Sequence, residues 1–311
     1  MSGLSRRVFV QQTALAGAGL KLGLLNTGLA QGTPAAKMSV AKYKNSPADA
    51  EGVAEEARRL TRKAISDLGG MTRFVSKGDK VWVKPNIAWD RTPEQAANTN
   101  PDVVATIVKM CYEAGARQVI VGDNPCNAQE RTYPNSGIRP AAEKEGARVT
   151  YLDKRRFKNM ALKGKSLKEW EMYTEMIEAD TFINVPIAKH HSLAGATLGM
   201  KNLMGACGGQ RSRFHQDLSN VLVDLAAFIK PKLVVLDAIR VLPVHGPVGG
   251  NLEDVKRRDT LVAGVDQVAI DALSATLLGM EPKKIGHIVE AQARGLGTMD
   301  YKSLSPVESV V

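Results

Sequence analysis

Lys80-Val-Trp-Val-Lys84 and Gln118-Val-Ile-Val-Gly122 are two short apolar runs, and a helical pattern over 101–115 separates them. Turn residues flank the runs, as is typical of strands. The alternation continues outward from this unit. Further strands are predicted at 148–152, 181–185, 232–236 and 260–265, and further helices at 51–68, 137–146, 164–178, 218–229, 267–278 and 284–294. Strands rich in Val, Ile and Leu that alternate with helices predict an α/β fold, with a mainly parallel sheet flanked by helices in three layers.

The first thirty residues are typical of a removable export signal. Arg6 and Arg7 precede a weakly apolar stretch, 13–30, which contains no acidic residue and ends in Gly-Leu-Ala30. This ending suits a signal peptidase, and paired arginines select the twin-arginine route. We therefore predict contact with the twin-arginine translocase, cleavage after Ala30 and a periplasmic mature protein. An uncleaved signal that holds the protein at the membrane surface is the alternative.

The rest of the chain is expected to contain one large α/β domain. Residues 31–77 are predicted to form a tether, or an early edge segment, followed by a helix. Residues 78–298 are predicted to form the α/β domain, and 299–311 a C-terminal tail. A basic run, 154–168, contributes much of the net charge of +10. A solvated hairpin or loop is one interpretation of this run, and attraction for anionic ligands or lipid headgroups is the other. Nucleic acid is not an expected partner, because the chain is predicted to be exported and only 5% of its residues are aromatic.

Cysteine usage limits the cofactors that the chain can hold by itself. Cys111, Cys126 and Cys207 are scattered and form no CxxC pair. Neither a zinc ribbon nor an intrinsic iron–sulfur cluster is therefore expected. A disulfide between Cys126 and Cys207 can form in an oxidising compartment, and the sequence does not determine their redox state.

Polar side chains follow several of the predicted strands. Lys84 and Asn86 come after the first strand, Asp123 after the second and Asp237 after the fifth. Ligands of open α/β sheets bind beyond the carboxyl ends of the strands, so we predict a ligand site at this edge. The stretch 184–215 is the densest in polar and glycine residues, and its candidates are Lys189, His190, Lys201, Asn202, Gly205, Arg211 and His215.

Two kinds of chemistry fit these residues. In one, His190 and His215 hold a metal together with a carboxylate from Asp123 or Asp237. In the other, the cationic side chains clamp a phosphate or a carboxylate; these are Lys84, Lys189, Lys201 and Arg211. Both interpretations apply together if an anionic cofactor carries the metal. If the protein is an enzyme, His190 is the predicted acid or base, with Lys189 and Asp123 beside it.

Several motifs resemble those of the DUF362 family, in the same order along 78–298. They include Val83-Lys-Pro-Asn86, Glu113-Ala-Gly-Ala-Arg-Gln-Val-Ile-Val-Gly-Asp123 and Lys189-His-His-Ser-Leu-Ala-Gly-Ala-Thr-Leu-Gly-Met-Lys201-Asn-Leu-Met-Gly205. The resemblance implies no defined activity. Many relatives carry ferredoxin-like cysteine clusters, which implies a redox setting, but this chain departs from them. At the level of the fold, the strand order and the His/Lys-rich loop are also similar to the lactate-racemase family, which uses a nickel-bearing nucleotide.

These observations predict an exported protein that binds an anionic ligand or a metal-bearing cofactor, in a setting where a redox protein is its partner. The alternative hypothesis is a non-catalytic accessory or delivery protein for an exported redox complex. The two differ in where the decisive residues lie, because a ligand site needs the strand ends, whereas a docking face can use the basic run 154–168.

Overall fold

The computed structural model describes residues 36–47 and 49–311, so the predicted twin-arginine signal lies outside the described residues. Their main sheet has the order β12-β1-β11-β10-β7-β2-β3-β4, and β8 pairs with β10 and β9. The strands are β1 (Met38–Lys42), β2 (Lys80–Pro85), β3 (Gln118–Val121), β4 (Arg148–Val149), β7 (Thr181–Val185), β8 (Ile187–His191), β9 (Gly195–Thr197), β10 (Leu233–Leu242), β11 (Lys256–Gly264) and β12 (Val307–Val310).

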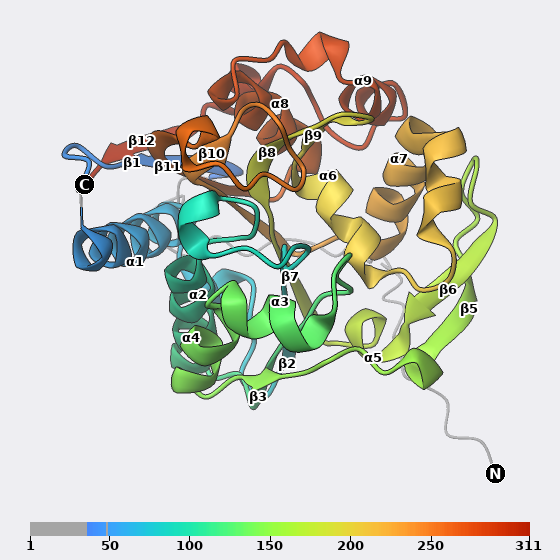
Figure 1. The fold of residues 1–311 in the computed structure, drawn as a ribbon, viewed down its shortest axis with the longest axis horizontal. Helices are drawn as coiled ribbons and strands as arrows, with labels where there is room; N and C mark the ends of the chain where they lie inside the picture. The colour runs from blue at the N-terminus through green and yellow to red at the C-terminus, as the bar shows by residue number, and fades with distance from the viewer. Residues whose placement is uncertain (1–35, 48) are drawn as a thin grey trace, which may run out of the picture. The chain divides into compact units, whose positions relative to one another are not determined.

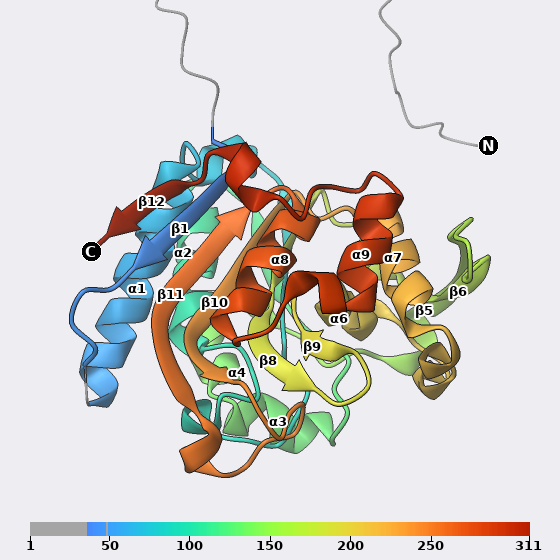
Figure 2. The same ribbon diagram turned by 90° about the horizontal axis from the view of Figure 1, so that it is seen from above.

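Helices cover both faces of this sheet, as the sequence predicted (Figure 1). The helices are α1 (Ala50–Asp67), α2 (Pro101–Glu113), α3 (Gln129–Asn135), α4 (Ile138–Lys144), α5 (Thr174–Ile177), α6 (Gly199–Asn202), α7 (Leu218–Ile229), α8 (Gln267–Leu277) and α9 (Gly286–Ala293). Figure 2 shows α1 on one side of β10 and β11, and α8 and α9 on the other. Two apolar clusters fill the two interfaces, one containing Leu60 and Ile107 and the other Leu222 and Ile270. The fold is therefore three-layered α/β.

Local sequence explains where the main helices begin. The Asp49 side chain accepts a hydrogen bond from the backbone N–H of Gly52, which satisfies a free donor at the start of α1. Asn100 caps α2 in the same way through the N–H of Asp102, and Pro101 follows as the first helical residue. The Asn100 cap places the start of α2 directly after the loop that follows β2.

Most of the pairings around the centre of the sheet are parallel. β4, β3, β2, β7 and β10 pair in parallel, in that order, so their carboxyl ends meet at one edge. β11 is antiparallel to both β10 and β1. None of the described helices is long and apolar enough to cross a membrane.

Both ends of the described chain contribute strands to the main sheet. β1 lies in the segment expected to be a tether or an early edge segment, and it pairs along its whole length with β11. β12 lies in the expected tail and pairs in parallel with β1. Both strands are short, and β1 follows a polar, Pro/Ala-rich segment, so the sequence pattern around them did not indicate strands.

The prediction of a helix over 164–178 was wrong. This segment contains β6 (Glu169–Tyr173), which pairs with β5 (Phe157–Ala161) in a separate two-stranded sheet, and α5 follows. Glu169 and Glu171 are exposed, whereas Trp170 and Met172 between and after them are more buried. This alternation has the period of a strand. The basic run therefore belongs to a hairpin, which was one of its two interpretations.

Candidate functional site

A buried ion pair lies at the ends of β2 and β3. Lys84 Nζ is 2.8 Å from Asp123 Oδ1, and their side chains are 0% and 3% exposed. Asp123 also accepts hydrogen bonds from the backbone N–H groups of Ile87 at 2.8 Å and Asn124 at 2.9 Å. Burial lowers the pKa of Lys84, and the carboxylate of Asp123 opposes this effect. The pair therefore fixes the two loops that follow these strands.

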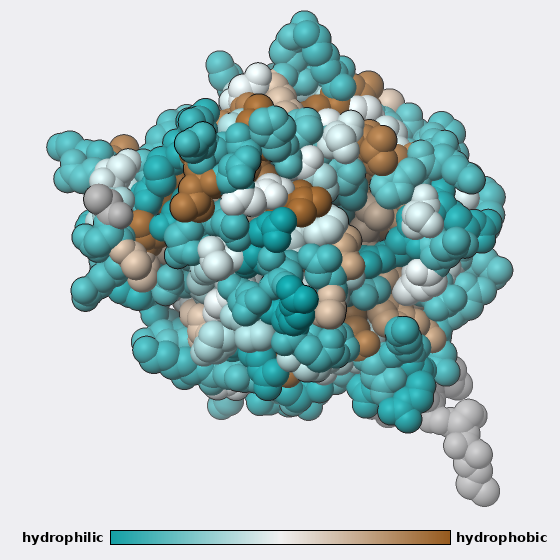
Figure 3. Space-filling view, in the orientation of Figure 1, coloured by the Kyte–Doolittle hydropathy of each residue, from teal (hydrophilic) through white to brown (hydrophobic). Residues whose placement is uncertain are grey.

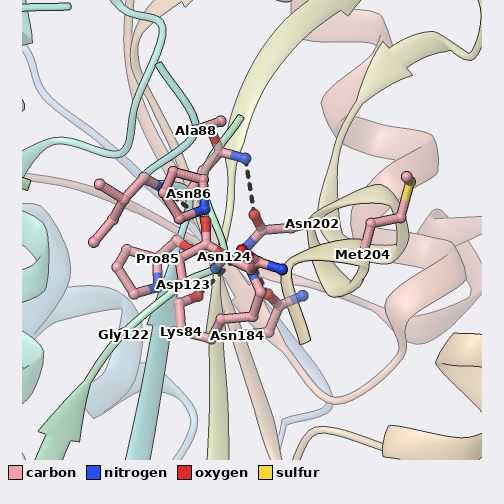
Figure 4. Close-up of polar contacts among 12 residues, drawn as sticks. Lys84, Pro85, Asn86, Ala88, Gly122, Asp123, Asn124, Asn184, Asn202 and Met204 are labelled. Carbon is pink, nitrogen blue, oxygen red and sulfur yellow. Dashed lines mark hydrogen bonds and ion pairs between the residues drawn. The ribbon is translucent and has the colours of Figure 1, made fainter. Parts of the chain in front are cut away.

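Three asparagine side chains extend this connection across the sheet (Figure 4). Asn86 Nδ2 donates to Asn202 Oδ1 at 2.9 Å, and Asn202 Nδ2 donates to Asn184 Oδ1 at 2.8 Å. Asn184 Nδ2 then donates to the carbonyl oxygen of Gly199 at 2.8 Å. All three side chains are buried. The chain of amides joins the end of β2, the end of β7 and the short helix α6, so these elements hold one another in place.

Gly205 allows the segment after α6 to approach this ion pair. Its carbonyl oxygen accepts a hydrogen bond from the N–H of Asn124 at 3.1 Å. A Cβ atom at this position would lie 1.7 Å from Asp123 Oδ1 and 2.8 Å from Lys84 Cε. Only glycine fits here, because the neighbouring atoms leave no room for a side chain.

A cavity of about 610 Å³ lies above these groups, at the carboxyl edge of the sheet. Asp123 is the one carboxylate among its lining residues, and Lys84 neutralises it from below. The other polar lining side chains are Asn86, Asn124, Cys126, Lys189, His191, Ser192, Thr197, Lys201, Asn202, Arg211, Ser212 and His215. The cavity therefore carries an excess of positive charge and of hydrogen-bond donors.

Two lysines line the cavity without a carboxylate partner among the described residues: Lys189 is buried, and Lys201 is partly buried. Lys189 Nζ donates to Asn86 Oδ1 at 3.0 Å and to the carbonyl oxygen of Ala97 at 2.5 Å. Burial lowers the pKa of Lys189 to about 7. Burial also lowers the pKa of Lys201 to about 8, an effect that Cys126 opposes. Both amines are therefore easier to deprotonate than an exposed lysine.

Arg211 provides a further cation without a carboxylate partner among residues 36–47 and 49–311. Its guanidinium donates to the carbonyl oxygens of Asn124 at 2.9 Å and Pro125 at 3.0 Å. These bonds hold the guanidinium at the cavity wall but leave its charge unneutralised. An anionic group in the cavity would face this charge.

β8 places His191 in the cavity and His190 outside it, because neighbouring side chains of a strand point to opposite faces. His191 Nδ1 accepts hydrogen bonds from the N–H groups of Leu193 and Ala194, both at 3.2 Å. Nδ1 therefore carries no proton, and the proton of the neutral ring is on Nε2. Burial lowers the pKa of His191 to about 3, and the charges of Lys201 and Lys189 lower it further. His191 is a neutral donor at pH 7.

The structure separates the two histidines predicted to share a metal. His190 Nδ1 donates to the carbonyl oxygen of Gly246 at 3.2 Å, and its side chain does not line the cavity. His215 does line it, and its ring lies 6.4 Å from that of His191. Within the described part of the chain, no group of three or more His, Cys, Asp or Glu side chains is arranged to hold a metal ion. His190 lies outside the cavity that His215 lines, and a metal held by both remains a prediction.

Two other predicted site residues support the cavity without lining it. Lys84 lies beneath it, paired with Asp123. Asp237 is buried in β10 and accepts hydrogen bonds from the N–H groups of Asn100 and Ile239. Burial raises the pKa of Asp237 to about 6. Asp237 therefore positions the start of α2, where Asn100 is the cap, and is not among the residues that line the cavity.

Several cavity residues were not predicted from the sequence. His190 and His191 are adjacent on a strand, so only one of them can face a ligand; His191 lines the cavity, whereas the predicted His190 does not. Asn124, Thr197 and Ser212 have common side chains with no motif of their own. Cys126 is exposed at the cavity wall, whereas Cys207 is buried against Met172, and both thiols are free.

A second cavity, of about 1030 Å³, adjoins the first. The two share Asn124, Cys126, Gly209 and Arg211. The larger cavity contains acidic side chains from the loops and the β5–β6 hairpin, including Asp153 and Glu171. The smaller cavity is the candidate ligand site, because Lys189, Lys201, His191 and the asparagine chain converge there.

Comparison with known proteins places the chain in a family. The thylakoid-associated protein sll1697 of Synechocystis sp. is 29% identical over 244 residues, which cover 76% of this chain and 74% of the relative. The lactate racemase apoprotein of Thermoanaerobacterium thermosaccharolyticum has a TM-score of 0.45 and 12% identity, over 74% of this chain and 54% of that one. This chain therefore spans about half of the racemase.

A structure from Thermotoga maritima gives a TM-score of 0.41 at 11% identity, and the match covers 80% of this chain and 60% of that one. The family model described as "Domain of unknown function (DUF362)" matches residues 81–276. This range includes most of β2, the residues that line the cavity and most of α8. This range is more than half of the chain, and the protein belongs to the DUF362 family.

Proposed function

We propose that the protein binds a small ligand with a carboxylate or phosphate group in the cavity at the carboxyl edge of its sheet. One observation carries this proposal. Lys189, Lys201 and Arg211 all line the cavity, and the one lining carboxylate, Asp123, is already paired with Lys84. Lys189 is buried, and Lys201 and Arg211 are partly buried. Desolvated cations without counter-charges are costly, and an anion would relieve that cost.

Each group has a separate part in this proposal. Lys201 and Arg211 supply charge, and the planar guanidinium of Arg211 suits an oxygen pair. His191 contributes its Nε2–H as a neutral donor. If the protein is an enzyme, the predicted role of His190 passes to His191 and His215, because these two histidines line the cavity.

A thermal-shift screen tests this function. Phosphate, sulfate, malonate and 2-oxoglutarate are compared with uncharged glycerol and urea at equal ionic strength. At least one anion should raise the melting temperature in a saturable way, because a ligand that binds the folded state stabilises it. The shift should be lost in Lys201→Met and kept in Lys158→Met, which alters an exposed lysine of β5 outside the cavity. Equal shifts in both variants would contradict the proposal.

Export by the twin-arginine route is a second part of the proposal. Its support is the sequence of residues 1–30, with Arg6-Arg7 before the weakly apolar stretch. Replacement of both arginines by lysine should leave the precursor inside the cell. The exported wild-type protein should begin at Gln31. Equal export of the Lys-Lys variant would exclude this route. An intact signal on the exported protein would favour the membrane-held form.

An accessory role in an exported redox complex remains the alternative function. Its support is the basic hairpin, where Lys154 and Lys158 are exposed and the described residues give neither an ion-pair partner. The face shown in Figure 3 is mainly hydrophilic, and its apolar side chains lie in separate small groups. A partner at this hairpin would therefore be acidic. Capture of a periplasmic redox protein that is lost in Lys154→Gln/Lys158→Gln, but kept in Lys201→Met, would favour this role.

A further inference from the structure

Among the amines that line the cavity, Lys201 is the one whose Nζ makes no hydrogen bond to a described residue. Lys84 is paired with Asp123, Lys189 donates to Asn86 and Ala97, and Arg211 donates to backbone carbonyls. No described residue accepts a hydrogen bond from Lys201 Nζ, although the side chain lines the cavity. An amine that contacts a ligand directly is expected to have no hydrogen-bond acceptor within the protein.

The backbone that carries Lys201 is held firmly. Asp271 Oδ1 accepts a hydrogen bond from the N–H of Gly199 at 2.7 Å, and its Oδ2 accepts one from Met200 at 3.1 Å. The next residue, Asn202, belongs to the buried asparagine chain. The residues on both sides of Lys201 are thus fixed, so the backbone holds Lys201 where its side chain lines the cavity.

The surroundings of Lys201 favour a nucleophilic amine. Burial is the largest effect that lowers the pKa of Lys201, and the charges of Arg211 and Lys84 lower it further. A lysine that is desolvated and lies near other cations is partly neutral near pH 7, and the neutral amine is the nucleophile. In the same cavity, His191 presents Nε2–H as a donor, and its neutral state follows from its two backbone contacts at Nδ1.

We infer that Lys201 forms a covalent imine with a small 2-oxo acid, whose carboxylate faces Arg211 and Lys189 and whose carbonyl oxygen faces His191. This inference rests on the proposed anion site and names the ligand class of that site. A 2-oxo acid carries both features that the cavity addresses: a carboxylate for the cations, and a neighbouring ketone for the amine. The cavity of about 610 Å³ is large enough for such a molecule.

The reaction needs no oxidant or reductant. The nitrogen lone pair of Lys201 attacks the ketone carbon, a C–N bond forms, and the C=O π pair moves to oxygen, where the Nε2–H of His191 stabilises the charge. One proton passes from nitrogen to this oxygen to give a carbinolamine. The nitrogen then expels the oxygen as water, with a second proton, and the C=N bond forms. One amine and one ketone thus give one imine and one water.

Reductive trapping tests this inference on the full mature chain. The protein is incubated with sodium cyanoborohydride and pyruvate, 2-oxobutyrate or 2-oxoglutarate in turn, and is then analysed by intact and peptide mass spectrometry. We expect a single adduct per chain, on the peptide that contains Lys201, with at least one of the three acids. Lys201→Arg is the decisive variant, because arginine keeps the charge but forms no imine. It should bind malonate and show no adduct.

The outcomes separate the two proposals. Wild-type protein that binds malonate but gives no adduct with any of the three acids would overturn the imine and leave the anion site. Protein that binds none of the screened anions and gives no adduct would overturn both. Adducts spread over surface lysines, at the same level in Lys201→Arg, would show non-specific reaction and would also overturn the imine. Lys158→Met should behave as the wild type.

Discussion

Lys84 Nζ and Asp123 Oδ1 lie 2.8 Å apart, with Asp123 in the lining of the cavity and Lys84 beneath it, and the carboxylate also accepts hydrogen bonds from two backbone N–H groups. Loss of one partner leaves the other charge buried alone. Asp123→Asn should therefore lower the free energy of unfolding by about 3–5 kcal/mol. Lys84→Met should cost less, because the backbone donors still satisfy Asp123.

A double-mutant cycle checks this relationship by urea denaturation. The variant with both Lys84→Met and Asp123→Asn should be more stable than the sum of the single effects indicates, because it leaves no unpaired charge. Additive effects would show that the two residues do not act as a pair.

Gly205 provides a second prediction about the same place. Gly205→Ala puts a methyl group into the space of Asp123 Oδ1 and Lys84 Cε, so it should lower the free energy of unfolding by about 3 kcal/mol or more. Gly295→Ala is the control. Gly295 has a φ of +72° and no atom within 4 Å of its added Cβ, so only backbone strain of about 1 kcal/mol is expected there. An equal loss in the free energy of unfolding at both positions would contradict the close approach of Gly205 to Asp123 and Lys84.

Lys189 should leave a signature in the pH dependence of stability. Its pKa is about 7 in the folded protein and about 10.4 in an unfolded chain. Between these values the unfolded state holds a proton that the folded state lacks, so the free energy of unfolding rises with pH, by up to about 1.4 kcal/mol per unit from this group. Below pH 7 its contribution is constant.

Lys189→Met removes this contribution. The free energy of unfolding of the wild type should therefore increase relative to that of the variant as the pH rises from 7 to 10. Urea denaturation at each pH measures this difference. The difference between wild type and Lys158→Met should stay constant over the same range. A constant difference for Lys189→Met as well would show that Lys189 titrates normally in the fold.

Anion binding should weaken as the pH rises. Lys201 has a pKa of about 8 and Lys189 of about 7, and their protonated forms, which attract an anion, are populated below these values. Sulfate keeps its charge from pH 6 to pH 9, so its association constant should fall about tenfold or more over this range. His215 also lines the cavity. His215→Gln should therefore keep the decrease, whereas a pH-independent association constant in the wild type would exclude the lysines as the binding groups.

The central part of the fold was predictable because its strands are continuous apolar runs. The runs at Lys80–Lys84 and Gln118–Gly122 correspond to β2 and β3, and the helix between them was also expected. β1 and β12 were missed because their stability comes from pairing with each other and with β11, far away in the sequence. The segment that forms β6 was taken for a helix, since charged residues obscure its two-residue period.

The site was predictable in its location and in its charge, but not in the orientation of single side chains. Lys189, Lys201 and Arg211 line the cavity, whereas His190 faces away and His191 faces inward. Strand alternation requires that the two histidines differ, but it does not say which one points to the ligand. Asp237 looked like a site residue because it follows a strand-like run, yet β10 continues to Leu242 and buries it.

Isothermal titration calorimetry with the anion that gives the largest thermal shift tests the central claim most directly. At pH 6.5 and fixed ionic strength, the wild type should bind one anion per chain. Lys201→Met should bind it about tenfold or more weakly, because one charge-assisted contact is worth about 1.5–3 kcal/mol, while Lys158→Met should match the wild type. Binding that is equally strong in Lys201→Met, or absent in the wild type for every anion, would contradict the assignment of this cavity as an anion site.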